Sequence, residues 1–259
     1  MINLQPLSYS HHNHIKIITR HGSEFGEAVH TAPVQLNELE NMCAQTPVCF
    51  MKNTETGQFG LYAILGFNEG ENLFLNNDQW LLDYIPLQFR CQPFAFALAP
   101  EQQTHATSAQ CISINIHSKR ISTTEGEALF NEDGTPTSYL NGIQNSLAHI
   151  ARAAHPTQLF IETLVTNNLV EAATIAITFN NGETFNYKGL YTINLDKLEE
   201  ITHAARVEPL EQLHINPHHA LLTQLEQQHY LAPITWLTQS IGNFQKLISL
   251  KNANINKAE

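Results

Sequence analysis

Charged residues are scarce in this chain, and basic residues are the scarcest. Only 14% of the 259 residues are charged, against roughly 25% in an average soluble domain. Lys and Arg number 13 against 24 Asp and Glu, so the formal net charge is −11. Because no stretch is rich enough in Lys and Arg to neutralise a row of phosphates, we expect no nucleic-acid partner.

The sequence also lacks a long apolar run. The longest runs, Leu61–Leu65 and Phe94–Ala99, are far shorter than the about 20 residues needed to cross a bilayer. The start of the chain, Met1–Pro6, has neither the basic region nor the apolar stretch of a signal peptide. The four cysteines lie in apolar segments without C-x-x-C spacing, which is typical of free thiols in a reducing compartment. We therefore expect a cytoplasmic protein without a membrane span.

Signatures of cofactor and metal sites are missing as well. No G-x-G-x-x-G or P-loop register is present. Histidine is abundant, with 14 residues, and on an extended strand His12 and His14 would share one face. No spacing supplies a third ligand, and Pro217 separates the pair His214 and His218. We predict neither a metal ion nor a cofactor, and no catalytic residue is assigned.

Short alternating segments dominate the N-terminal half. Turn residues separate them, which is typical of an antiparallel β meander. We predict strands at residues 14–19, 48–52, 58–67, 94–99 and 111–117. Apolar residues at helical spacing predict a helix over residues 36–43, which Pro47 ends.

Beyond Asp133-Gly134 the apolar period becomes that of amphipathic helices. We predict helices around Leu140–Ile150, Thr157–Val165, Leu195–Ala204 with Asn194 as N-cap, Pro217–Gln228, and Ile234–Ile248. Between them, the dipeptide Asn181-Gly182 predicts a type I′ turn in a β-hairpin at residues 174–190. The fold class is therefore α+β, in a single compact domain over residues 1–259. A subdivision near residue 135, with 1–135 mainly β and 136–259 mainly α, is left open.

The last predicted helix carries a regular apolar stripe. Ile234, Leu237, Ile241, Phe244 and Ile248 step by three and four residues, so they lie along one face. Such a face needs a partner surface. The sequence leaves two partners open, which are the core of the same chain and a second copy in a homo-oligomer.

Five residues are our candidates for a ligand site, namely Trp80, Tyr84, Arg90, Arg120 and Glu127. The segment Ser118–Glu127 gathers hydroxyls, cations and carboxylates within ten residues, and Arg120 can position a carboxylate or amide ligand. The alternative is a polar strand end and turn. Arg90 likewise has an alternative role in a buried ion pair with Asp83 or Glu71.

Several short motifs follow one another in an order that resembles a known bacterial family. Thr56–Phe59, Ala63–Gly66 and Gly70–Leu75 are similar to the TGxF, ALLG and GENLFL core of the SapC family. The similarity runs from about His14 to Asn252 and includes Trp80, Tyr84–Pro86, Arg90, Pro93-Phe94, Ser118–Ser122, Glu125–Glu127 and Gly189–Ile193. The resemblance implies a link to a bacterial surface (S-) layer, and the biochemical role of the family is otherwise obscure. The chain departs from the family at Asn115, His117 and Asn194, where the family tends to carry acidic residues.

The shared motifs are aromatic, Gly and Pro residues rather than a nucleophile–base pair. We therefore expect a non-enzymatic, intracellular binding or assembly protein that engages a peptide or protein partner. A second hypothesis is an enzyme or enzyme accessory that uses His14, Glu125, Glu127 or His214, with or without a metal. A third is a structural subunit of a surface layer. Elemental analysis of untagged protein and cell fractionation separate the three.

Overall fold

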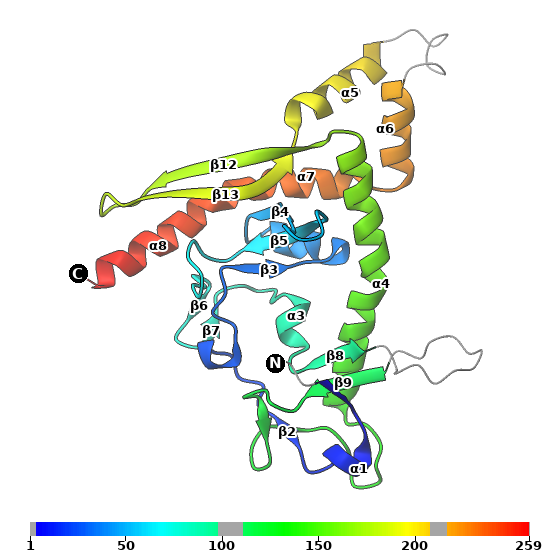
Figure 1. The fold of residues 1–259 in the computed structure, drawn as a ribbon, viewed down its shortest axis with the longest axis vertical. Coiled ribbons are helices and arrows are strands. Elements are labelled where there is room, and N and C mark those ends of the chain that lie inside the picture. The colour runs from blue at the N-terminus through cyan, green and yellow to red at the C-terminus, as the bar shows by residue number, and fades with distance from the viewer. Residues whose placement is uncertain (1–3, 98–110, 208–216, 259) are drawn as a thin grey trace. The chain divides into compact units, whose positions relative to one another are not determined.

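Antiparallel sheets combine with helices that are most numerous in the C-terminal part, which confirms the α+β class (Figure 1). The computed structural model describes residues 4–97, 111–207 and 217–258. The chain divides into two units, each made from two separate segments. Unit 1 comprises Met1–Ala28 and Leu75–Arg152, and unit 2 comprises Val29–Phe74 and Ala153–Glu259. The predicted subdivision near residue 135 is a different division, because it separates a mainly β part of the chain from a mainly α part. It stays a prediction.

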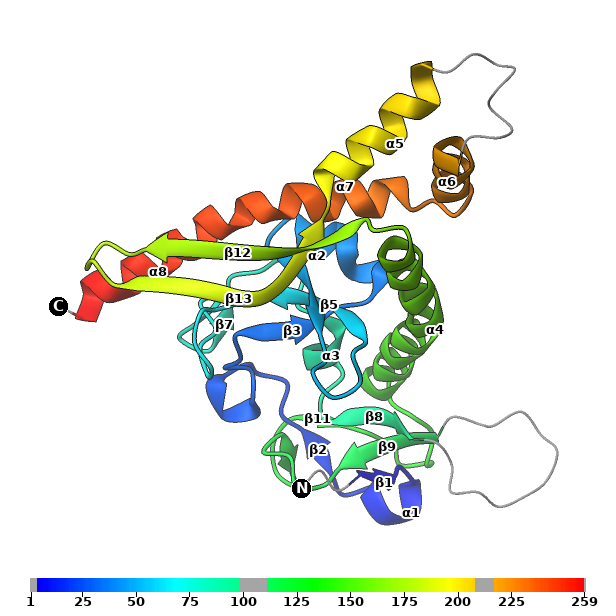
Figure 2. The ribbon, with the colours of Figure 1, turned by 45° about the horizontal axis from the view of Figure 1, so that its top comes forward.

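Unit 1 is built from very short strands. The strands are β1 (Leu4–Pro6), β2 (Lys16–Ile17), β6 (Leu75–Asn76), β7 (Gln79–Trp80), β8 (Phe94–Ala97), β9 (Cys111–Asn115), β10 (Ile121–Ser122) and β11 (Glu127–Ala128). The helices are α1 (Tyr9–His12), the 3-10 turn η1 (Ser23–Phe25), α3 (Leu87–Arg90) and the first part of α4 (Ser138–Thr166). All pairings are antiparallel. Strand β9 lies between β1 and β8 (Figure 2). Strand β2 lies between β10 and β11, and β6 pairs with β7.

The core of unit 1 forms where α4 meets the strands. Leu140, Ile143 and Leu147 are buried with Ile17 of β2 and Ile114 of β9 in one hydrophobic cluster. The apolar stripe predicted for this helix is therefore confirmed. Burial of this face against the strands stabilises the short strands, since two-residue pairings contribute few hydrogen bonds of their own.

Unit 2 is built on one five-stranded antiparallel sheet with the order β12-β13-β4-β5-β3. The strands are β3 (Thr31–Pro33), β4 (Val48–Lys52), β5 (Phe59–Ile64), β12 (Val170–Thr178) and β13 (Thr184–Ile193). The helices are η2 (Leu36–Glu38), α2 (Leu39–Cys43), the second part of α4, α5 (Leu195–Val207), α6 (Pro217–Gln227), α7 (Leu231–Ser240), η3 (Ile241–Asn243) and α8 (Phe244–Ala258). The sheet thus joins the predicted 48–52 and 58–67 strands to the predicted C-terminal hairpin.

The apolar stripe of the last helices docks within unit 2. Ile234, Leu237 and Phe244 are buried, and α7 packs against α2, β4 and β13. Ser240 Oγ accepts a hydrogen bond from the backbone N–H of Val48 at 3.1 Å, which fixes α7 to β4. Figure 1 shows α8 beside the β12–β13 hairpin, where Asn252 Oδ1 accepts from the backbone N–H of Asn180. Docking on the same chain is confirmed, whereas a homo-oligomer through this face stays a prediction.

One local prediction about a turn is corrected by the structure. The β12–β13 hairpin is present, but Gly182 alone of the Asn-Gly pair has a positive φ, at +82°. The N–H of Gly182 donates to the carbonyl of Phe179, so the loop is a type I turn closed by a left-handed glycine. The two consecutive positive φ angles of a type I′ turn occur instead at Asn77 and Asp78, between β6 and β7.

The extents of some elements also differ from the predictions. The helix near Thr157–Val165 is the continuation of α4, which runs through Pro156 without a break. The predicted strand at 14–19 shortens to β2. The N-cap of α5 is confirmed, since Asn194 Oδ1 accepts from the backbone N–H of Lys197 at 2.8 Å.

Candidate functional site

A buried carboxylate, Glu27, organises the centre of unit 1. Its side chain is fully buried, and it lies just after η1, where Gly26 turns the chain in the left-handed region at φ +81°. Three groups lie at hydrogen-bond distance besides Arg120: Gly22 N at 3.0 Å, Trp80 Nε1 at 3.0 Å and His21 Nδ1 at 2.9 Å. Because a carboxylate only accepts, the His21 tautomer that fits carries its proton on Nδ1.

Arg120 is the charged partner of Glu27. Its Nη2 donates to Glu27 Oε1 at 2.5 Å, and its Nη1 donates to the carbonyl oxygens of Ile18 and Arg20 at 2.9 and 2.7 Å. The guanidinium also lies over the ring of Phe25, 4.5 Å from its centroid. Burial lowers the pKa of Arg120 below its ordinary value, and the negative charge of Glu27 opposes that shift. The pair therefore ties the 18–27 segment to the start of β10.

The five predicted site residues are placed differently from one another. Trp80 and Arg120 meet at Glu27. Arg90 is exposed, and its Cζ lies 5.9 Å from the ring centroid of Tyr84. The buried ion pair suggested for Arg90 is therefore wrong. Glu71, one of the suggested partners, accepts instead from Lys251 Nζ at 2.6 Å within unit 2.

Glu127 takes no part in the hydrogen bonds described above for Glu27. It is on β11, where its backbone pairs with Ile17 and its side chain is exposed. Glu125 is exposed as well and lies 3.5 Å from Arg20. The carboxylate at the centre is thus Glu27, which sequence reasoning missed.

A small cleft of about 200 Å³ opens beside the Glu27–Arg120 pair. Its polar lining consists of Thr19, His21, Arg90, Gln92, Arg120 and Tyr139. Among the described residues, Arg120 Nε has no hydrogen-bond partner. Burial raises the pKa of Tyr139 to about 12, so the phenol keeps its proton at neutral pH and remains a donor.

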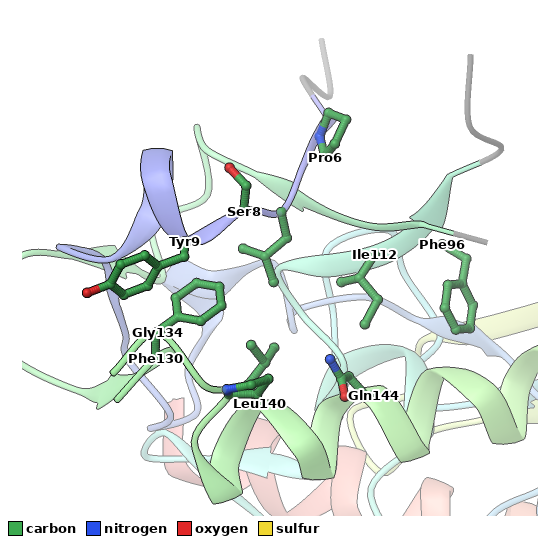
Figure 3. Close-up of a pocket in the computed structure, with 11 residues that line it drawn as sticks. Pro6, Ser8, Tyr9, Phe96, Ile112, Phe130, Gly134, Leu140 and Gln144 are labelled. Atoms are coloured by element: carbon green, nitrogen blue, oxygen red, sulfur yellow. The ribbon is translucent and has the colours of Figure 1, made fainter. Parts of the chain in front are cut away.

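A larger groove of about 620 Å³ lies where α4 faces the end of β1, α1 and strands β8 and β9 (Figure 3). Its apolar lining includes Leu7, Tyr9, Phe96, Ile112, Phe130 and Leu140. The rings of Tyr9 and Phe130 meet edge to face, with centroids 5.5 Å apart. Gln144, one turn after Leu140 on α4, brings a polar amide to the lining.

The histidines do not assemble as a strand-based site would require. His11 and His12 lie on helix α1, so His12 and His14 do not share a strand face, and that expectation is wrong. His12 is buried and His14 is exposed. His218 Nε2 lies 3.4 Å from Glu200, and His214 lies outside the described residues. In the described ranges, no group of three or more His, Cys, Asp or Glu side chains is placed to hold a metal ion.

Cys43 and Cys49 are buried thiols in unit 2. Burial raises the pKa values of Cys43 and Cys49 to about 12. At pH 8 the thiolate fraction of each is then about one in 10,000, and it stays small until the pH approaches 12. We expect iodoacetamide to leave Cys43 and Cys49 unmodified in the native protein up to pH 9 and to modify both in guanidinium chloride. Peptide mass spectrometry checks this, and native labelling at the denatured rate would contradict it.

These features define an α+β protein built on antiparallel sheets, with a buried Glu–Arg pair, a small polar cleft and an apolar groove in one unit. The chain belongs to the SapC family, whose family model matches residues 7–247, and the resemblance of the motifs is thereby confirmed. No curated protein and no solved structure matches the chain. Within the described ranges, every helix is too short or too polar to traverse a bilayer.

Proposed function

We propose that this SapC-family chain is a non-enzymatic, intracellular binding protein that captures an apolar segment of a peptide or protein partner. The observation that carries the proposal is the apolar groove of unit 1. Its volume of about 620 Å³ falls within the range of roughly 300–1,000 Å³ that is usual for ligand sites. Its lining is mostly aliphatic and aromatic, with few polar groups to orient a ligand.

The shape of the lining favours side chains of a peptide over a polar metabolite. Phe96 and Ile112 come from adjacent strands, while Leu140 and Gln144 come from the facing helix α4 (Figure 3). Burying one Leu or Phe side chain between such walls stabilises a complex by about 1.5–3 kcal/mol. Two neighbouring apolar side chains of an extended segment therefore suffice for measurable binding.

The groove offers little for catalysis. Among its described lining residues, Tyr9 is the one that carries an ionisable side chain, and its hydroxyl donates to the carbonyl of Glu132 at 3.3 Å. General acid–base chemistry needs at least one group that changes protonation near neutral pH. The burial of Cys43, Cys49 and Cys91 supports a reducing, intracellular setting.

Selection from a phage-displayed library of random 12-residue peptides tests this function. We expect enriched peptides to carry paired aromatic or branched aliphatic residues. Gln144→Lys places a cation in the groove and should weaken the best peptide at least tenfold by fluorescence polarisation, since an ion next to apolar walls loses solvation.

Asn145→Lys is the matched control, because Asn145 is the exposed next residue on α4 and does not line the groove. It adds the same charge and should leave the affinity unchanged. The proposal fails if no apolar motif is enriched, or if the two Lys variants bind the selected peptide equally well.

A further inference from the structure

The small cleft beside Glu27 has a chemistry different from that of the apolar groove. The two hollows share no lining residue, although Tyr139 and Leu140 are neighbours on α4. We propose that the cleft is a second binding site, for the carboxylate group of a ligand, held between Arg90 and Arg120. This site does not depend on the function proposed for the groove.

Arg120 supplies the fixed part of the site. Its Nη1 and Nη2 are held by Ile18 O, Arg20 O and Glu27, so the guanidinium cannot swing away. Its Nε has no partner among the described residues, even though the residue is only 3% exposed. A buried N–H without an acceptor destabilises the free protein, and an acceptor oxygen supplied by a ligand removes that penalty.

The remaining lining fits a planar acceptor. Tyr139 contributes a hydroxyl that stays protonated at neutral pH, and Gln92 contributes an amide. Two oxygens of a carboxylate can then accept from Arg120 Nε and from a second donor. Arg90 is exposed at the same cleft and adds a second cation, so a charge-assisted hydrogen bond can form there.

Charge decides which anion fits. Glu27 lies behind Arg120 and offsets one of the two arginine charges. A monoanion matches the single positive charge that is left, whereas a dianion such as phosphate would bring one negative charge without a partner. The volume of about 200 Å³ also suits a carboxylate with a short stem rather than a large ligand.

The test is a titration of the full chain, with the Arg Nε–Hε resonances followed in ¹H–¹⁵N correlation spectra at constant ionic strength. Sodium acetate should shift the Arg120 resonance saturably, and acetamide, its neutral isostere, should not. N-acetylalanine and N-acetylaspartate amide then present the carboxylate at a chain end and on a side chain. The tighter of the two identifies the source of the group.

Variants locate the binding. Arg90→Gln removes an exposed cation without disturbing the buried pair, and it should weaken acetate binding about tenfold. Arg152→Gln, at an exposed residue of α4 outside the cleft, removes the same charge and should have no effect. Gln144→Lys in the apolar groove should also leave acetate binding intact, so the two proposals fail independently.

Four outcomes would overturn the carboxylate site. They are the absence of a saturable shift with every carboxylate, an equal shift with acetamide, equal weakening by Arg90→Gln and Arg152→Gln, and tighter binding of inorganic phosphate than of acetate.

Discussion

Replacing Glu27 with glutamine is expected to lower the free energy of unfolding by about 3–5 kcal/mol. The substitution leaves the Arg120 guanidinium buried without its counter-charge, and it turns an amide NH₂ toward donors such as Trp80 Nε1 and Gly22 N. A buried ion that loses its partner retains the full cost of its desolvation. Urea unfolding followed by tryptophan fluorescence measures the loss, and Trp80 reports directly on this centre.

Two comparisons make this prediction specific. Glu24→Gln removes an exposed carboxylate that lies 3.0 Å from the exposed Arg20, and it should change stability little. In the double variant Glu27→Gln with Arg120→Met, the loss should be smaller than the sum of the two single losses, because neither charge is then stranded. Equal effects of Glu24→Gln and Glu27→Gln would show that the buried pair contributes nothing.

Sequence reasoning identified Trp80 and Arg120 at this centre and missed Glu27, the carboxylate that joins them. Trp80 and Arg120 stood out as an aromatic residue and a clustered cation. Glu27 follows Ser23-Glu24-Phe25-Gly26, a short polar segment that resembles any exposed turn. Its partner Arg120 is 93 positions away, and no local spacing encodes such a pairing. The feature of the sequence that could have indicated burial of Glu27 is the preceding pair Phe25-Gly26. Phe25 is buried, and Gly26 has a left-handed conformation that turns the next side chain inward.

In the fold, too, features set by neighbouring residues could be predicted, whereas features set by pairing of distant residues could not. The helical spacing of Leu140, Ile143 and Leu147 predicted a real helix, because burial of one face sets that spacing. The short apolar segments at 48–52 and 58–67 predicted real strands. The type I′ turn was predicted at Asn181-Gly182 because the dipeptide favours it. Loop length decides the turn type, and register sets loop length: Asn76 pairs with Gln79 and leaves two residues, whereas Thr178 pairs with Thr184 and leaves more. Cross-strand register is a property of the packed sheet.

Gly126→Ala is expected to destabilise the protein by about 3 kcal/mol or more, although Gly126 is exposed. The residue has a φ of +104°, and a Cβ there would overlap the backbone carbonyl of Ile17 in β2. Relief of that overlap requires β11 to move away from β2, which opens the sheet at the segment that holds Arg120.

Gly182→Ala is the matched control, because φ is +82° there but no atom lies within 4 Å of the added Cβ. Its cost should be the left-handed conformation alone, about 1–2 kcal/mol. Urea unfolding of the two variants separates the contributions, and a Gly126→Ala protein no less stable than Gly182→Ala would mean that β2 and β11 are not held in this register.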